Sequence, residues 1–149
     1  MKWVTRRRIQ VNRTATAWFV RRFVDPAAEF FFVAPEEVAA VEAGEPAIGF
    51  DAPGARYPHE DTMGRCSFEA LVAEHRPHDA VLLEMAKIVR GADFPEDIDL
   101  TPESAGLLAI SRGFPLVAKD DRETVERSAF LYDALHASLA ARLGSRSAR

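Results

Sequence analysis

Glu29-Phe30-Phe31-Phe32-Val33 is the segment that most strongly indicates the fold class. Aromatic and β-branched side chains favour a strand, and an apolar run without polar alternation is typical of a strand buried on both faces of a parallel sheet. We therefore predict that residues 29–33 form a strand of a parallel sheet and that both faces of this strand are covered.

The residues on either side of this strand predict a regular alternation of strands and helices. Proline suits the first position of a helix, and the residue before a proline is pushed out of the helical region. The expected elements are a strand at 2–6, a helix at 15–24 with Thr14 as its N-cap and Asp25-Pro26 as its end, a helix from Pro35 to Gly44, and a strand at 47–50. This β-α-β-α-β order predicts an α/β fold with a small, mostly parallel, three-stranded sheet.

From residue 67 onward the sequence predicts helices alone. Most of them begin at a residue whose side chain can cap the first backbone amides, and glycine marks two of the ends. The expected helices are 68–75 capped by Ser67, 80–90 capped by Asp79 and ended by Gly91, one opened by Thr101-Pro102-Glu103 that ends near Gly113, and one from Asp120 to about Leu143. We expect a single domain at 1–143 with a helix-rich C-terminal half, and a flexible tail at 144–149.

Composition narrows the class of protein. The chain has 149 residues, of which 48% are hydrophobic and 28% are charged, and these proportions are typical of one folded globular domain. No apolar run approaches the roughly 18 residues of a membrane-spanning helix, and the basic N-terminus is not followed by the apolar stretch of a signal peptide. We therefore expect a cytoplasmic protein. The single cysteine, Cys66, excludes an internal disulfide and a multi-cysteine metal cage.

Basic residues gather at the N-terminus. The first 24 residues carry seven of the 19 basic residues and none of the 23 acidic ones. Helix N-termini beside strand ends favour anions, so we predict a tetrahedral-oxyanion site formed by Arg13, Arg21 and Arg22, with the run at 6–8 adding long-range attraction. The alternative is a solvated face that pairs with the acidic remainder of the chain. The low isoelectric point, about 5.6, opposes direct DNA binding.

The polar segment at 51–65 lies between the third strand and the next helix, where a long loop is often functional. His59, Cys66 and Glu69 are the ligand types that a divalent transition metal accepts, so we predict that they form a metal site. Two alternatives stay open. Cys66 can be a small buried hydrophobic residue with His59 exposed, or a redox-responsive thiol whose pKa is lowered at a helix N-terminus.

Other polar groups do not form a recognisable catalytic set. Asp93, Asp97 and Asp99 surround a proline and are interpreted as solubilising and capping residues. Asp133 and His136 share one face of the last helix, as exposed pairs on helices often do. Glycine-rich phosphate-binding loops and the serine hydrolase motif are absent from the sequence, so catalytic residues stay unknown.

Several longer motifs occur together between residue 2 and about residue 140. They are Lys2-Trp3-Val4-Thr5-Arg6, Arg21-Arg22-Phe23-Val24-Asp25-Pro26, Cys66-Ser67-Phe68-Glu69, Ile88-Val89-Arg90-Gly91-Ala92-Asp93 and Tyr132-Asp133-Ala134-Leu135. In these motifs the chain resembles the C-terminal domain of the bacterial chromate-resistance protein ChrB.

The resemblance implies a role in the bacterial stress response to chromate. Longer ChrB relatives add an N-terminal half and act as chromate-responsive regulators of an efflux operon, so we expect this chain to act as a stand-alone accessory or sensor domain. Chromate and sulfate are tetrahedral dianions, which arginine side chains bind well. The alternative is a small metal-dependent or redox enzyme in the same pathway.

Overall fold

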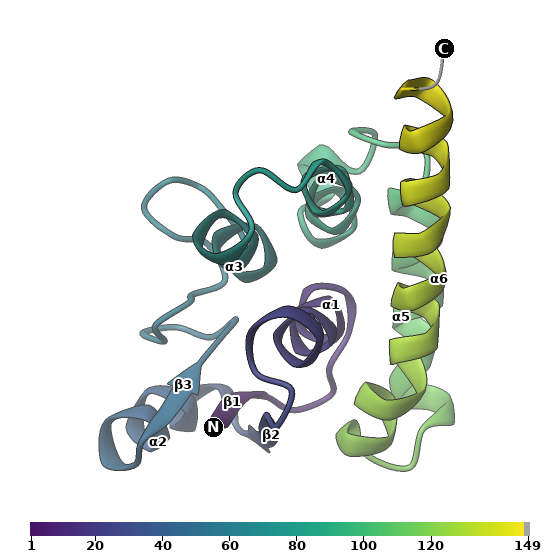
Figure 1. Ribbon diagram of the computed structural model, residues 1–149. Coiled ribbons are helices and arrows are strands. Elements are labelled where there is room, and N and C mark those ends of the chain that lie inside the picture. The colour runs from purple at the N-terminus through teal and green to yellow at the C-terminus, as the bar shows by residue number, and fades with distance from the viewer. Residues whose placement is uncertain (148–149) are drawn as a thin grey trace.

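A computed structural model describes residues 1–147, and the fold is α/β (Figure 1). A three-stranded sheet is built in the first third of the chain, and the rest is helical. The strands are β1 (Lys2–Arg6), β2 (Glu29–Val33) and β3 (Ala47–Gly49); the helices are α1 (Val11–Phe19), α2 (Val38–Gly44), α3 (Ser67–His75), α4 (Ala80–Asp93), α5 (Ser104–Val117) and α6 (Asp121–Ser147). Short helical turns at Val20–Val24, Pro35–Glu37 and Pro95–Asp97 extend or connect them. The predicted β-α-β-α-β order is confirmed.

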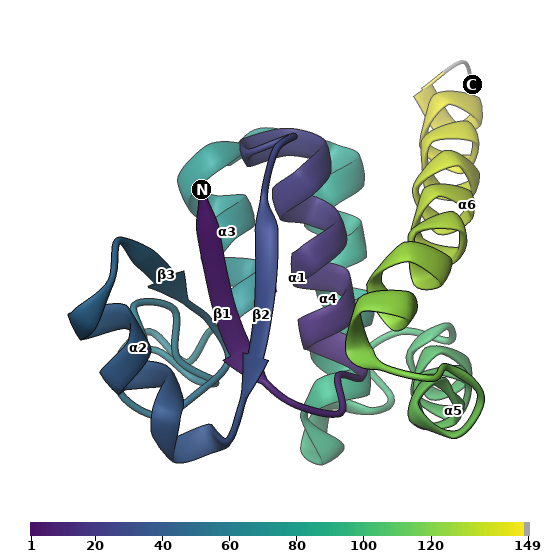
Figure 2. The same ribbon diagram turned by 90° about the horizontal axis from the view of Figure 1, so that it is seen from below.

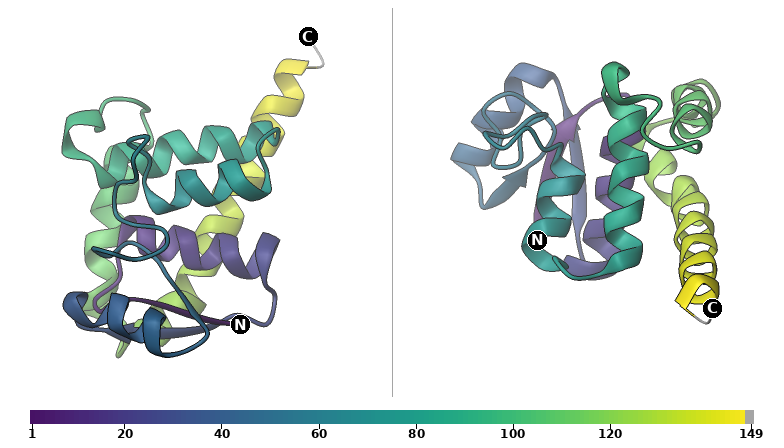
Figure 3. Two further views of the ribbon diagram at one scale, coloured as in Figure 1. Left: turned by 90° about the vertical axis from the view of Figure 1, so that its left-hand side faces the viewer. Right: turned by 90° about the horizontal axis from the view of Figure 1, so that it is seen from above.

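The strands lie in the order β2-β1-β3 and both pairings are parallel. Trp3 on the central strand is in register with Phe30 and Ile48. Successive side chains of β1 pack in two different hydrophobic clusters. Trp3 belongs to the main cluster with α1, and Val4 belongs to a smaller cluster with Val38 of α2. The layers are therefore α2, the sheet, α1, and then α3 with α4 (Figures 1 and 3). The predicted parallel sheet is confirmed.

Strand β2 differs from the prediction in one respect. Phe30 is buried, but Phe31 is 38% exposed and its ring lies under the Lys2 ammonium at 5.5 Å. The expectation that residues 29–33 are buried on both faces is wrong, because β2 is an edge strand and α2 packs against β1 and β3. The strand that is buried on both faces is β1.

The start of α1 and the end of α4 also differ from the prediction. Helix α1 begins at Val11 rather than Ala15, so Thr14 is not its N-cap; the Thr14 hydroxyl instead lies 2.5 Å from the Tyr132 hydroxyl inside the core. Helix α4 continues past Gly91 to Asp93. A Cβ atom at Gly91 would lie 2.3 Å from Ser104 Oγ, so this glycine allows α4 and the start of α5 to approach closely rather than ending the helix.

Two helix starts agree with the sequence, whereas the end of α5 does not. The Asp79 side chain caps α4 by accepting a hydrogen bond from the Leu82 amide at 3.0 Å, and Asp120 accepts one from the Glu123 amide at 2.8 Å before α6. Helix α5 passes the expected end at Gly113 and runs to Val117.

Helix α6 runs to Ser147, past the expected end near Leu143, and its C-terminal part extends away from the body of the domain (Figure 2). The tail expected at 144–149 thus begins inside a helix, and 148–149 lie outside the described residues. Across the described residues, every helix is too short or too polar to cross a bilayer.

Candidate functional site

A cavity of about 410 Å³ opens where β1 and β3 end, next to the N-terminus of α1 and the C-terminus of α4. Its charged lining consists of Arg6, Arg13, Asp51, Asp93 and Arg112. In parallel α/β folds, ligands bind at this edge of the sheet, outside the carboxyl ends of the strands. The cavity is therefore the candidate site.

Asp51 lies at the centre of the charged lining. It follows β3, and its side chain is only 3% exposed. One carboxylate oxygen, Oδ2, is 3.2 Å from Arg6 Nη2 and 3.4 Å from Arg13 Nε, while Oδ1 is 2.8 Å from His59 Nδ1. Arg6 Nε also donates to the Asp51 carbonyl at 2.6 Å. Asp51 is thus held by three cationic or polar side chains at once.

The backbone at this edge of the sheet is strained. Asp51 has a φ of +51°, Arg8 in the β1–α1 loop has a φ of +58°, and Val11 at the start of α1 has a φ of +28°. A non-glycine residue in this region costs about 1–3 kcal/mol and persists where its surroundings fix it. Arg13 and Asp121 supply such contacts. The Arg13 guanidinium donates to the carbonyls of residues 6–8 at 3.3 to 3.5 Å, and Asp121 accepts from the amides of residues 8 and 9 at 2.9 Å.

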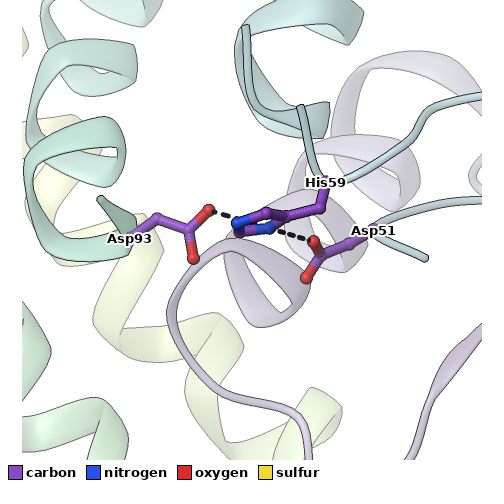
Figure 4. Close-up of side chains that lie close together, drawn as sticks. All are labelled: Asp51, His59 and Asp93. Atoms are coloured by element: carbon purple, nitrogen blue, oxygen red, sulfur yellow. Dashed lines mark hydrogen bonds and ion pairs between the residues drawn. The ribbon is translucent and has the colours of Figure 1, made fainter. Parts of the chain in front are cut away.

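His59 lies between two carboxylates, Asp51 and Asp93, as Figure 4 shows. Its Nδ1 is 2.8 Å from Asp51 Oδ1 and 3.7 Å from Asp93 Oδ2, and its ring packs against Phe94 at 5.1 Å. The hydrogen bond to Asp51 raises the pKa of His59 above its ordinary value. The imidazole is about half exposed, so it can be reached from solvent.

Asp93 is the last residue of α4, and its Oδ2 atom is buried without a hydrogen-bond partner. Burial raises the pKa of Asp93 to about 7, and the negative charge of Asp51 adds to this shift. A buried carboxyl group that titrates near neutral pH beside a histidine is typical of a functional site. The sequence-based interpretation of Asp93 as a solubilising loop residue is therefore wrong.

The three arginines expected to share an oxyanion site do not lie together. Arg13 lines the cavity, but Arg21 and Arg22 follow α1 at its other end. There Arg21 contacts Glu126 at 2.7 Å and Arg22 contacts Asp133 at 2.6 Å, which is the solvated pairing that the alternative explanation expects. Arg6 and Arg112, rather than Arg21 and Arg22, line the cavity together with Arg13.

The structure also separates Cys66 and Glu69 from His59. Cys66 is fully buried as the N-cap of α3, where its side chain accepts the Glu69 amide, and burial raises the pKa of its thiol well above the ordinary value. The Glu69 carboxylate is used by the Cys66 amide at 3.1 Å and by Arg90 at 2.9 Å. The geometry therefore favours Asp51 and Asp93 as the partners of His59, and it opposes a low-pKa thiol.

Sequence reasoning missed Asp51, Asp93 and Arg112 as site residues. The position of Asp51 in the sequence could have identified it, because a carboxylate directly after a buried strand in a parallel fold lies at the ligand-binding edge of the sheet. No local sequence pattern identifies Asp93 and Arg112, because these residues reach the cavity through the packing of α4 and α5.

Two comparisons with known proteins agree with each other. The family model described as "ChrB, C-terminal domain" matches residues 3–139. Protein ChrB of Cupriavidus metallidurans is 30% identical over 138 residues, which cover 91% of this chain but 40% of that protein. The chain thus spans less than half the length of this curated relative. No solved structure gives a significant match. The chain belongs to the ChrB C-terminal domain family.

Proposed function

We propose that this domain acts in bacterial chromate resistance as an accessory or sensor domain that binds chromate, or a sulfate-like oxyanion, in the arginine-lined cavity. Membership of the ChrB C-terminal domain family supports a role in chromate resistance, because the resemblance to ChrB implies that role. One observation carries the choice of ligand: Arg6, Arg13 and Arg112 line a single cavity at the N-terminus of α1.

The charge balance of the cavity supports an anion. Three guanidinium groups line it, against the carboxylate of Asp51 and the Asp93 carboxyl group, whose pKa is about 7. Arg6 and Arg13 are engaged with Asp51, whereas Arg112 is exposed and has no ion-pair partner within residues 1–147. Arg112 therefore offers uncommitted donors to an oxyanion, and charge-assisted hydrogen bonds of this kind are among the stronger ones.

The N-terminus of α1 supports the same ligand class. Gln10, the N-cap residue, makes no side-chain capping hydrogen bond, and the first turn contains no acidic residue. Such a helix end presents unsatisfied amides and the positive end of the helix dipole, and both favour an anion. Val11, at the first position of the helix, lines the cavity.

The predicted metal site at His59, Cys66 and Glu69 has less support, since Cys66 caps α3 and Glu69 accepts a hydrogen bond from Arg90.

The alternative function, a small metal-dependent or redox enzyme, is favoured by one contact: a carboxylate-bound imidazole such as His59 is a common acid–base group. Consumption of chromate with an added reductant, faster with the parent protein than with His59→Ala, would favour the enzyme. Unchanged chromate would favour the sensor.

Calorimetric titration of the purified chain with chromate and with sulfate tests the proposal. Arg112→Ala removes a guanidinium group that makes no hydrogen bond or ion pair with the residues that the structure describes, and we expect affinity to fall about tenfold or more, the worth of one charge-assisted hydrogen bond. Arg7→Ala is the matched control, because Arg7 is an exposed arginine outside the cavity lining. Arg13→Ala should also cost more than Arg7→Ala. Equal losses in the cavity and control variants, or no binding by the parent, would overturn the proposal.

A further inference from the structure

We propose that Asp51, His59 and Asp93 form a binding site for a first-row divalent cation beside the arginine-lined cavity. The site shares Asp51 and Asp93 with the lining of the cavity. It goes beyond the proposed function, because its ligand is a cation whose binding can be tested without any oxyanion.

The geometry of the donor atoms fits one ion. One atom from each of the three side chains lies within 4.8 Å of the other two. Carboxylate oxygens and imidazole nitrogens bind Zn²⁺ at about 2.0–2.2 Å, so two ligands of one ion lie up to about 4.4 Å apart. Small side-chain rotations are enough to bring the three atoms into a coordination sphere.

Asp93 supplies a separate reason for a cation. Its Oδ2 atom is buried and lacks a hydrogen-bond partner, and a buried oxygen of this kind is costly unless something compensates it. Asp93 is also the last residue of α4, and the C-terminal end of a helix favours positive rather than negative charge. A cation next to Asp93 Oδ2 would remove both penalties.

Asp51 is positioned by contacts that leave one of its oxygens directed at this point. Arg6 and Arg13 approach Oδ2, whereas Oδ1 faces His59. Partners that fix the second oxygen of a ligating carboxylate are a regular feature of metal sites, because they orient the ligand. The 2.8 Å contact between His59 and Asp51 is the one that a bound ion would replace.

The ligand set indicates the class of ion. One imidazole and two carboxylates, without a thiolate, suit Mn²⁺, Fe²⁺ or Zn²⁺ rather than a soft ion such as Cu⁺. Three protein ligands leave further positions open to water. The nearby arginines would weaken the binding of a cation alone, and an oxyanion in the cavity would offset that repulsion. This coupling, unlike the cation site, rests on the proposed function.

Binding of Mn²⁺ to the chelator-treated full chain tests the inference, with free Mn²⁺ measured by electron paramagnetic resonance and no chromate or sulfate present. We expect one site per chain. His59→Ala and Asp93→Asn should each weaken binding by about tenfold or more, since even the partners of metal ligands are worth about 10–100-fold. His78→Ala and Asp99→Asn, which change exposed residues of the same types, should bind as the parent does.

Thermal melting separates a lost ligand from a lost fold. Asp93→Asn keeps the shape of the side chain and removes a buried charge, so without metal it should melt at or above the temperature of the parent. Mn²⁺ should raise the melting temperature of the parent and leave that of Asp93→Asn unchanged. Absence of Mn²⁺ binding by the parent, or binding by both ligand variants that is as tight as that of the parent, would overturn the cation site. Failure of the chromate titration in metal-free buffer would instead overturn the proposed function.

Discussion

The two ends of the first long helical segment, residues 11–24, carry arginines in opposite situations. At the start, Arg13 is 14% exposed, contacts a buried carboxylate and crosses a loop whose backbone is strained. At the end, Arg21 and Arg22 are 35% and 47% exposed and pair with carboxylates of α6. The difference shows that arginine content does not by itself mark a binding site. Burial, a cavity and an uncapped helix N-terminus distinguish the first end from the second.

The largest effect should come from breaking the buried contacts of Asp51. Asp51→Asn keeps the size of the side chain and suits the left-handed backbone, but it leaves Arg6 and Arg13 without their counter-charge. We expect the free energy of unfolding to fall by about 3 kcal/mol, as for other buried pairs that lose one partner. Urea denaturation measures this change.

Glu126→Ala is the matched variant at the other end, since it breaks the exposed pair with Arg21. An exposed ion pair contributes under about 1 kcal/mol, so this variant should be nearly neutral. Equal losses of stability in the two variants would remove the contrast between the ends.

A smaller, pH-dependent effect is expected at the second end. His136 packs against Trp18 and Phe23, with ring centroids 5.7 and 5.8 Å apart, and burial together with the Arg22 charge lowers the pKa of His136. The unfolded chain therefore binds a proton more readily than the folded one. The contribution of neutral His136 to the free energy of unfolding is fully present above the ordinary histidine pKa of about 6.5. It is lost as the pH falls through the lowered pKa that His136 has in the folded protein.

His136→Gln should reduce that decline, and denaturation at pH 8 and pH 5 measures it. His78→Gln, at an exposed residue, is the control and should leave the parent's pH dependence intact. A decline of the same size in parent and His136→Gln would show that His136 does not contribute.

Local sequence patterns predict the fold well where one residue type has one structural role. The run Phe30-Phe31-Phe32, the proline at the start of the second helical segment and the Asp79 cap specify the parallel strand and two helix starts. The exposure of Phe31 was not predictable, because strand order decides which strand lies at the edge. Gly91 was misread because local rules assign glycine to helix ends, whereas here the packing of α4 against Ser104 requires it.

Local sequence patterns also predicted one part of the candidate site, the position of Arg13. Arg13 is next to the first helix start and could be found from the chain order. The meeting of Asp51 and Asp93 at His59 could not be predicted, because 41 residues lie between the two in the chain and their proximity depends on how α4 packs against α1. The early start of α1 had no sequence signal either, since a β-branched residue such as Val11 rarely adopts a positive φ.

Titration of isotope-labelled protein with sulfate and with chromate, followed through the backbone amide signals in nuclear magnetic resonance spectra, tests whether the cavity binds an oxyanion. We expect the signals of Gln10, Val11 and Arg112 to move together and saturate, while those of Arg21 and Arg22 stay in place. Shifts that are confined to Arg21 and Arg22, or that are equally weak at both ends, would contradict an oxyanion site in the cavity.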